Sequence, residues 1–285
     1  MGQSGQTQSL VSTDWLEQNL GQDGIVVVDG SWYLPAMNHD GAAEFFQGHI
    51  PGAVYFDIDE ISDHAIDLPH TMPSAEFFAQ KAGALGIRET DQVVVYDGGG
   101  LFSAARVWWM FRTFGSKRVA VLDGGLPAWK AENRPLESGQ TSRPVATYTP
   151  RYDASALAVT ADVEAALQTG AAQIADARAA PRFNGEAPEP RPGLPSGHMP
   201  GAKNLPVGEL VKDGRLKDAT ALVQAINAAG IDTHNAVITS CGSGVSAAII
   251  NLAFEVSGLP APRLYDGSWT EWASSGKPVQ PKPQP

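Results

Sequence analysis

The strongest constraint on the fold is an internal repeat that spans almost the whole chain of 285 residues. Four phrases of the first half return in the same order in the second half. They pair as IVVVDGSWY (around Asp29) with IADARAAPRF (around Asp176), GHIPGAVYFDID (from Gly48) with GHMPGAKNLPV (from Gly197), VVVYDGGG (to Gly100) with AVITSCGSG (to Gly244), and VLDGGLPAW (to Trp129) with LYDGSWTEW (to Trp272). Solenoid repeats are only about 20–50 residues long, so this period indicates duplicated domains.

Each half alternates short β-branched runs with helical patterns, which is typical of an α/β domain. The expected strands are 25–28, 92–96 and 119–122 in the first half, and 173–175, 236–239 and 263–265 in the second. We therefore predict two tandem α/β domains, each with a mainly parallel sheet flanked by helices. The predicted bounds are 8–135 for the first domain, 136–157 for a linker, 158–276 for the second domain, and 277–285 for a Pro-rich tail that reads as polyproline-like or disordered.

Composition narrows the class of partners. Hydrophobic residues make up 43% and charged residues 18% of the chain, which is ordinary for a soluble globular protein. The net charge of −11 disfavours nucleic acid and anionic membranes. The single cysteine fits a reducing compartment, and MGQSGQTQSLVSTDW has no signal-peptide features. We expect a soluble, cytoplasmic, monomeric protein without a bilayer-spanning segment.

The single cysteine, Cys241, lies between a predicted strand and a predicted helix, in VITSCGSGVSAAII. Glycines at this place let successive backbone N–H groups point inward as an anion-binding nest. The helix N-terminus adds partial positive charge, so the setting favours a reactive thiolate. A lone cysteine is more often an inert core residue, but a core position needs no flanking glycines. The repeat places Asp97 at the equivalent position of the first half, so only the second half carries a nucleophile.

Two chemistries use a cysteine loop of this kind. Tyrosine-type phosphatases need an arginine six residues after the cysteine to bind the phosphoryl oxygens, and here that residue is Ala247. The alternative is sulfur transfer, in which the thiolate takes a sulfane sulfur and holds it as a persulfide.

The phrases CGSGVSA, GHIPGA with GHMPGA, RVWWMFRTFG and LDGGLPAW resemble the tandem-domain rhodanese family, and more narrowly its 3-mercaptopyruvate sulfurtransferase branch. The resemblance implies a non-catalytic N-terminal rhodanese-like domain, a catalytic C-terminal one, and an active site between them. It implies transfer of the sulfur of 3-mercaptopyruvate, through a Cys241 persulfide, to a thiol or cyanide, with release of pyruvate. It implies no metal and no organic cofactor.

The resemblance also assigns substrate-binding residues. Thiosulfate-using rhodaneses resemble CRKGV at the loop, whereas this chain has the neutral Gly242 and Ser243. Arg182 and Arg191 match the arginines that hold the carboxylate and ketone of mercaptopyruvate in that branch. The remaining loop residues expected to bind substrate are Gly242, Gly244, Val245 and Ser246.

Asp59 and His70 match an acid and a histidine that the family places near the cysteine. With them a relay Cys241–Ser243–His70–Asp59 is proposed as the catalytic set. An isolated histidine or aspartate is more often a structural hydrogen-bonding residue, and that interpretation stays open here. The other histidines show no metal-ligand spacing.

Two alternatives remain. One is thiosulfate:cyanide sulfurtransferase, which the neutral loop disfavours. The other is a non-catalytic rhodanese-like module that docks a partner or carries a persulfide. In every version the donor is a small molecule, and the acceptor is cyanide, a small thiol or a thioredoxin-like protein.

Replacement of Cys241 by Ser tests the nucleophile directly. Because a serine hydroxyl is not ionised at neutral pH and cannot form a persulfide, we expect complete loss of sulfur transfer with an unchanged circular dichroism spectrum. Sulfur transfer above background in this variant would contradict the assignment.

Overall fold

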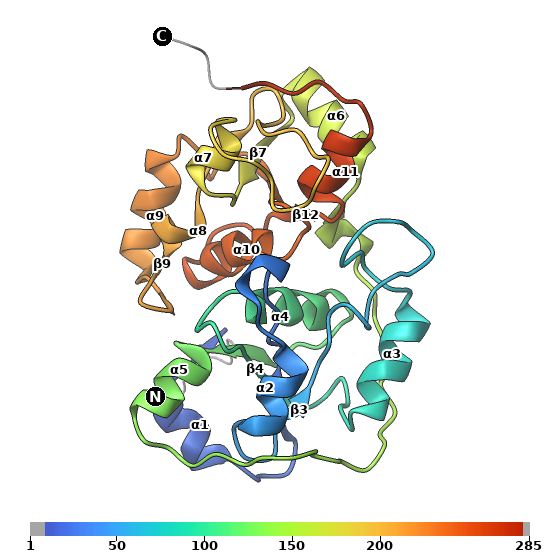
Figure 1. The fold of residues 1–285 in the computed structure, drawn as a ribbon, viewed down its shortest axis with the longest axis vertical. Coiled ribbons are helices and arrows are strands. Elements are labelled where there is room, and N and C mark those ends of the chain that lie inside the picture. The colour runs from blue at the N-terminus through green and yellow to red at the C-terminus, as the bar shows by residue number, and fades with distance from the viewer. Residues whose placement is uncertain (1–8, 282–285) are drawn as a thin grey trace.

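The computed structural model describes residues 9–281. Residue 8, the predicted start of the first domain, and residues 282–285 of the predicted tail lie outside the described part. The chain forms two α/β domains, one above the other in Figure 1.

Each domain contains a five-stranded sheet, and the strand order is the same in both: β1-β5-β4-β2-β3 and β6-β12-β11-β7-β8. All neighbouring pairs within the two sheets are parallel. The bounds in the first sheet are β1 Leu10–Val11, β2 Ile25–Asp29, β3 Val54–Tyr55, β4 Gln92–Tyr96 and β5 Val119–Leu122. Those in the second are β6 Leu157–Ala158, β7 Ala172–Asp176, β8 Lys203–Asn204, β11 Ala236–Ser240 and β12 Arg263–Tyr265. An antiparallel hairpin, β9 Val211–Lys212 with β10 Arg215–Leu216, is added to the second domain.

Helices cover both faces of each sheet, as parallel sheets require. The first domain has α1 Thr13–Asn19, η1 Pro35–Met37, α2 Gly41–Gln47, α3 Ala75–Ala84, α4 Ala104–Thr113 and α5 Gly125–Ala131. The second has η2 Ala154–Ala156, α6 Thr160–Thr169, α7 Ala180–Phe183, α8 Val207–Leu210, α9 Ala219–Ala228, α10 Ala247–Val256 and α11 Ser268–Ser274.

The predicted fold class and strands are confirmed. The edge strands β1, β3, β6 and β8 were not predicted, because two-residue strands carry no detectable alternation. The tail was predicted to be polyproline-like or disordered; in its described part, Gln280 instead pairs with His198 in an antiparallel bridge.

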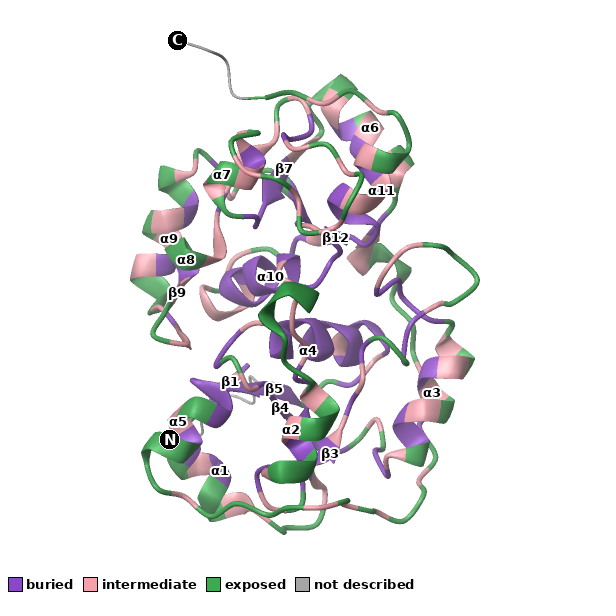
Figure 2. Cartoon of the chain, in the orientation of Figure 1, coloured by how far each residue is buried: buried purple, intermediate pink, exposed green. Residues whose placement is uncertain are grey.

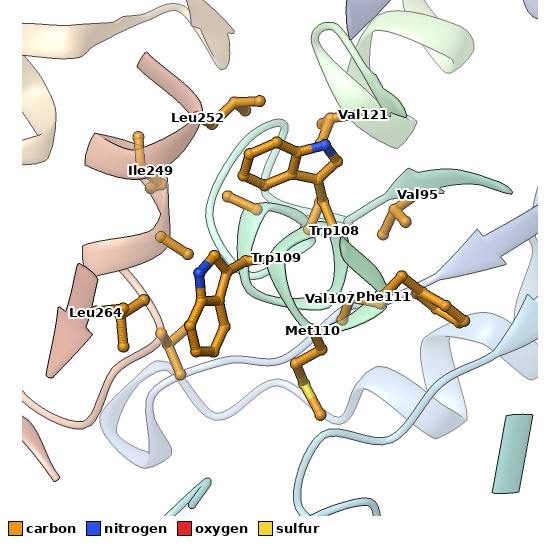
Figure 3. Packing of buried hydrophobic residues seen from close by; sticks show 14 of the residues in the cluster. Val95, Val107, Trp108, Trp109, Met110, Phe111, Val121, Ile249, Leu252 and Leu264 are labelled. Atoms are coloured by element: carbon orange, nitrogen blue, oxygen red, sulfur yellow. The ribbon is translucent and has the colours of Figure 1, made fainter. Parts of the chain in front are cut away.

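The two domains meet through α4 and α10, the helices that follow the equivalent loops of the repeat. Both helices are buried on nearly every side (Figure 2). Figure 3 shows Trp109 of α4 facing Ile249 of α10 and Leu264 of β12 within one apolar cluster. A helix that is apolar all round needs cover on every face. The interface is therefore a shared hydrophobic core, and it brings the beginnings of α4 and α10 to the seam between domains.

Between Ser9 and Pro281, no helix combines the length and the apolar character needed to cross a membrane.

Candidate active site

Cys241 lies directly after β11, in a loop whose first two carbonyl groups accept hydrogen bonds from backbone N–H groups of α11. The N–H of Trp269 donates to the carbonyl of Cys241 at 2.9 Å, and that of Thr270 donates to the carbonyl of Gly242 at 3.0 Å. The N–H of Cys241 donates to Ser268 Oγ at 3.2 Å. In the described part of the chain, the N–H groups of residues 242–246 have no hydrogen-bond acceptor. We call residues 241–246 the cradle loop. Its free N–H groups form an anion-binding nest beside Cys241, a residue that is only 2% exposed.

The equivalent loop of the first domain shows what such a nest binds. The carboxylate of Asp97 accepts N–H hydrogen bonds from Gly99 at 2.9 Å, Phe102 at 2.7 Å and Ala104 at 2.8 Å. Burial raises the pKa of Asp97, and these N–H donors counteract that rise. The first domain thus fills its own nest with a carboxylate, whereas the second places a sulfur there and keeps its N–H donors for another anion.

A pocket of about 450 Å³ opens over the cradle loop. Among its lining residues are Trp32, Leu34 and Phe102 of the first domain, and Arg182, Arg191, Cys241, Gly242, Ser243, Val245 and Ser246 of the second. Gly244 does not line the pocket but shapes the turn. Its φ of +78° belongs to the left-handed region, and a Cβ there would lie 3.0 Å from the carbonyl oxygen of Asp266. The structure therefore brings both arginines and all the predicted loop residues except Gly244 to one pocket between the domains.

The two arginines converge above Gly242. A Cβ built on Gly242 would lie 3.2 Å from Arg182 Nη2 and 4.0 Å from Arg191 Nη1. Burial lowers the pKa of Arg191, and the nearby charges of Cys241 and Asp59 counteract this. Two guanidinium groups beside the thiol make a site for a small carboxylate, and a glycine at this loop position leaves room for it.

His70 and Asp59 lie at the edge of the same site. His70 Nδ1 is 2.8 Å from Asp59 Oδ1, and Trp32 Nε1 donates to Asp59 Oδ2 at 2.9 Å. Burial lowers the pKa of His70 below its usual 6.5, although Asp59 opposes the shift. Arg191 Nη2 lies 3.3 Å from His70 Nε2, and because a guanidinium only donates, Nε2 acts as the acceptor. His70 is then neutral, with its proton on Nδ1 facing Asp59.

Of the predicted relay Cys241–Ser243–His70–Asp59, the structure shows the contact between His70 and Asp59. Within residues 9–281 the hydroxyl of Ser243 makes no hydrogen bond to another residue, and His70 Nε2 contacts Arg191. The link between Ser243 and His70 stays a prediction.

Sequence reasoning missed Arg106 and Asp266, which join the domains behind the cradle loop. Arg106 is fully buried on α4, and its Nη2 donates to His70 O at 2.6 Å and to Asp266 Oδ1 at 2.7 Å. Its Nη1 donates to Gly244 O at 3.5 Å, and Met72 N–H donates to Asp266 Oδ2 at 2.6 Å. The sequence did contain one signal for Arg106, a single arginine inside the apolar run AARVWWMF. An arginine in such a run is expected to be buried, and a buried charge requires partners.

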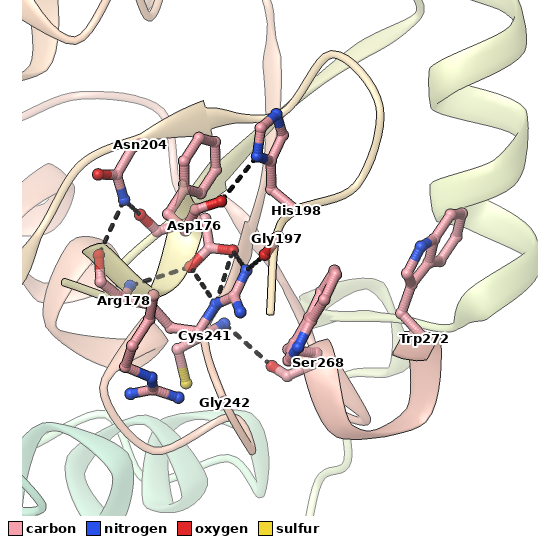
Figure 4. A network of polar contacts seen from close by, with 12 residues as sticks. Asp176, Arg178, Gly197, His198, Asn204, Cys241, Gly242, Ser268 and Trp272 are labelled. Carbon is pink, nitrogen blue, oxygen red and sulfur yellow. Dashed lines mark hydrogen bonds and ion pairs between the residues drawn. The ribbon is translucent and has the colours of Figure 1, made fainter. Parts of the chain in front are cut away.

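Glu189 was missed as well, and it holds Arg182 in place. Arg182 Nε donates to Glu189 Oε1 at 3.2 Å, and Arg178 Nη1 donates to the same oxygen at 2.9 Å. Arg178 also contacts Asp176, as Figure 4 shows, and stacks on Trp269 with 4.2 Å to the ring centroid. Arg178 also borders the pocket, but its side chain is fully buried in these ion pairs, so it is a structural arginine, and Arg182 and Arg191 are the partly exposed arginines of the pocket.

Among residues 9–281, no three or more His, Cys, Asp or Glu side chains are grouped so that they could hold a metal ion.

Comparison with known proteins agrees with the duplicated architecture. A family model described as "Rhodanese-like domain" matches twice, over residues 12–132 and 159–275. The chain belongs to the rhodanese family. Both copies of the domain are complete enough to match separately, as the internal repeat predicted.

Relatives within the rhodanese family cover nearly the full chain. A 3-mercaptopyruvate sulfurtransferase of Escherichia coli K12 is 42% identical over 277 residues, covering 96% of this chain and 99% of the relative. The human 3-mercaptopyruvate sulfurtransferase is 39% identical, covering 95% of this chain and 94% of its own. The crystal structure of SseA from Escherichia coli, reported as a 3-mercaptopyruvate sulfotransferase, superposes with a TM-score of 0.86 at 40% identity, covering 92% of this chain and 99% of SseA.

Two arginines on α4 give a matched test of the domain junction. Arg106→Met leaves Asp266 buried without its charged partner, so we expect a loss of about 3–5 kcal/mol in the free energy of unfolding. Arg112→Met removes the half-exposed ion pair with Glu255 and should cost less than about 1 kcal/mol. Urea unfolding of both variants measures the difference, and equal losses would contradict a central role for Arg106.

Proposed function

We propose that this protein is a sulfurtransferase that takes the sulfur of 3-mercaptopyruvate onto Cys241 and passes it to a thiol or cyanide. The observation that carries the proposal is the convergence of Arg182 and Arg191 over the neutral Gly242, beside the one cysteine. This arrangement suits a small α-keto carboxylate with sulfur at its other end. The names of relatives at 39–42% identity support the same donor.

In the proposed first step, the Cys241 thiolate attacks the substrate sulfur and an S–S bond forms. The C–S bond breaks, and its electron pair leaves on carbon as the enolate of pyruvate, which then takes a proton. Arg182 and Arg191 hold the carboxylate and ketone oxygens. The cradle loop N–H groups stabilise the negative charge near the reacting sulfur, in the manner of an oxyanion hole.

In the second step, the acceptor attacks the outer sulfur and the Cys241 thiolate leaves. No outside oxidant is needed, because the transferred sulfur keeps its oxidation level when it moves from the persulfide to the acceptor. A thiol acceptor becomes a persulfide, and cyanide becomes thiocyanate.

His70 takes part in the proposed reaction through its contact with Arg191. When the substrate carboxylate draws Arg191 toward it, His70 Nε2 loses its donor and becomes available to the Ser243 hydroxyl. Asp59 keeps the Nδ1 proton in place and so fixes which nitrogen faces the site. In this relay the thiol proton of Cys241 would pass through the Ser243 hydroxyl to His70 Nε2 as the thiolate forms, and the same proton would return through Ser243 to the enolate.

A second donor is favoured by one comparison. An Arabidopsis thaliana protein named "Thiosulfate/3-mercaptopyruvate sulfurtransferase 1, mitochondrial" is 39% identical, covering 94% of this chain and 76% of its own. Thiosulfate therefore belongs in the test, although a pocket with a neutral cradle loop favours a carboxylate.

Intact mass after incubation with each donor tests the proposal. We expect 3-mercaptopyruvate to add one sulfur atom at Cys241 with release of an equal amount of pyruvate, and Cys241→Ser to show neither. A gain with thiosulfate alone would move the protein to the thiosulfate branch. No gain with either donor would favour the non-catalytic module.

The pH profile tests His70. Asp59 raises the pKa of His70 against the lowering effect of burial, so Asp59→Asn should lower that pKa further. If protonation of His70 causes the acidic fall in kcat/KM for 3-mercaptopyruvate, this fall should move to lower pH in Asp59→Asn. The matched control is Glu60→Gln, an exposed neighbour that should leave the profile unchanged. An unchanged acidic limb in Asp59→Asn would exclude His70 as the titrating group.

A further inference from the structure

Residues 277–281, which we call the C-terminal strap, pack along the second domain, with Pro281 near Gly185 and Val279 near Gly197 at the two ends of the loop that carries Arg191. Trp272 Nε1 donates to Pro278 O at 2.9 Å. Val279 packs against the apolar cluster that contains Met199 and Trp269. Gln280 pairs with His198 through two backbone hydrogen bonds, of 2.8 Å and 3.0 Å. The strap is thus held by side-chain, apolar and backbone contacts together.

The partner of the strap, His198, closes the base of the loop that carries the arginines. Its Nδ1 lies 2.8 Å from Phe183 O, and its ring stacks on Phe183 with centroids 4.0 Å apart. The preceding Gly197 N–H donates to Arg182 O at 3.2 Å. Residues 182–183 and 197–198 are therefore fastened together, and the loop between them carries Glu189 and Arg191 (Figure 4 shows Gly197 and His198 beside Arg178).

The other end of the strap is fastened to α11, which also holds the cradle loop. Trp272 lies on the same helix as Trp269 and Thr270, whose N–H groups bind the carbonyls of Cys241 and Gly242. The strap thus connects the element that positions the nucleophile with the loop that positions the arginines.

The first domain repeats the arrangement and provides an internal comparison. Trp129 Nε1 donates to Pro135 O at 2.7 Å, His49 pairs with Glu137 through backbone hydrogen bonds of 2.8 Å and 2.9 Å, and its ring stacks on Phe45 at 4.0 Å. There the equivalent nest is filled by the carboxylate of Asp97. The same device is structural in the first domain and lies beside a substrate pocket in the second.

We propose that the C-terminal strap is a positioning element for Arg182 and Arg191, which sets their distance from the cradle loop and so the affinity for the α-keto carboxylate donor. This inference rests on the proposed function, because it gives both arginines the task of binding the donor. The inference assigns donor binding and cysteine reactivity to different parts of the structure. Binding of the donor depends on the strap, whereas the reactivity of Cys241 depends on α11 and the cradle loop.

The test compares three variants with the unmodified protein. Trp272→Phe loses the hydrogen bond to Pro278 but keeps an aromatic ring in the core. A chain that stops after Gly276 lacks the strap altogether. Trp129→Phe is the matched control, since it removes the equivalent bond from the first domain.

We expect KM for 3-mercaptopyruvate to rise about tenfold without the strap and measurably in Trp272→Phe, because displaced binding groups lose affinity steeply. The kcat value should change little, and so should the rate at which iodoacetamide, a neutral reagent, alkylates Cys241. Trp129→Phe should lower the melting temperature about as much as Trp272→Phe but leave KM unchanged.

Four outcomes would overturn the inference. If KM is unchanged in Trp272→Phe and in the shortened chain while the unmodified protein turns over, the strap does not position the arginines. If Trp129→Phe raises KM equally, or if alkylation of Cys241 changes along with KM, the effect is general destabilisation. If the unmodified protein neither turns over 3-mercaptopyruvate nor gains sulfur, the proposed function fails, and the inference with it.

Discussion

The buried guanidinium of Arg106 is the contact on which the arrangement of the site depends. A guanidinium withdrawn from water is tolerated only where acceptors surround it. Here the acceptors are His70 O of the first domain, and Asp266 and Gly244 O of the second. The domains cannot slide past each other without leaving this charge unpaired. One interaction therefore fixes the histidine, the cradle loop and the apolar α4–α10 interface relative to one another.

The duplicated loops explain why the two domains differ in function although their folds agree. Both loops end a central strand, begin an interface helix and turn N–H groups toward one point. In the first domain, Asp97 satisfies those groups with its own carboxylate. In the second, Cys241 supplies a nucleophile and leaves the donors for an outside anion. The exchange of one residue, with the arginines added around it, separates a structural loop from a reactive one.

Different parts of the site were predictable to different degrees. The cradle loop was predicted from local pattern alone, because the cysteine, the glycines and the helix that follows are neighbours in sequence. Arg182, Arg191, Asp59 and His70 came from the family resemblance; the structure places both arginines in the pocket with Cys241 and connects His70 and Asp59 to it through Arg191. Arg106, Asp266 and Glu189 were missed, because each acts through partners distant in sequence, which a single chain without its fold does not reveal.

The sequence by itself determined the duplication, the α/β class, the main strands and the position of the nucleophile, since these follow from short-range periodicity and from the repeat. Only the tertiary structure decided that Arg182 is partly exposed in the pocket while Arg178 is fully buried and structural, because the two arginines occur in the same short phrase and differ in what packs around them. It also brought Arg191 Nη2 within 3.3 Å of His70 Nε2 and packed residues 277–281 against the loop that carries Arg191. Those outcomes depend on burial and on pairing between distant segments, and both arise only when the two domains close on each other.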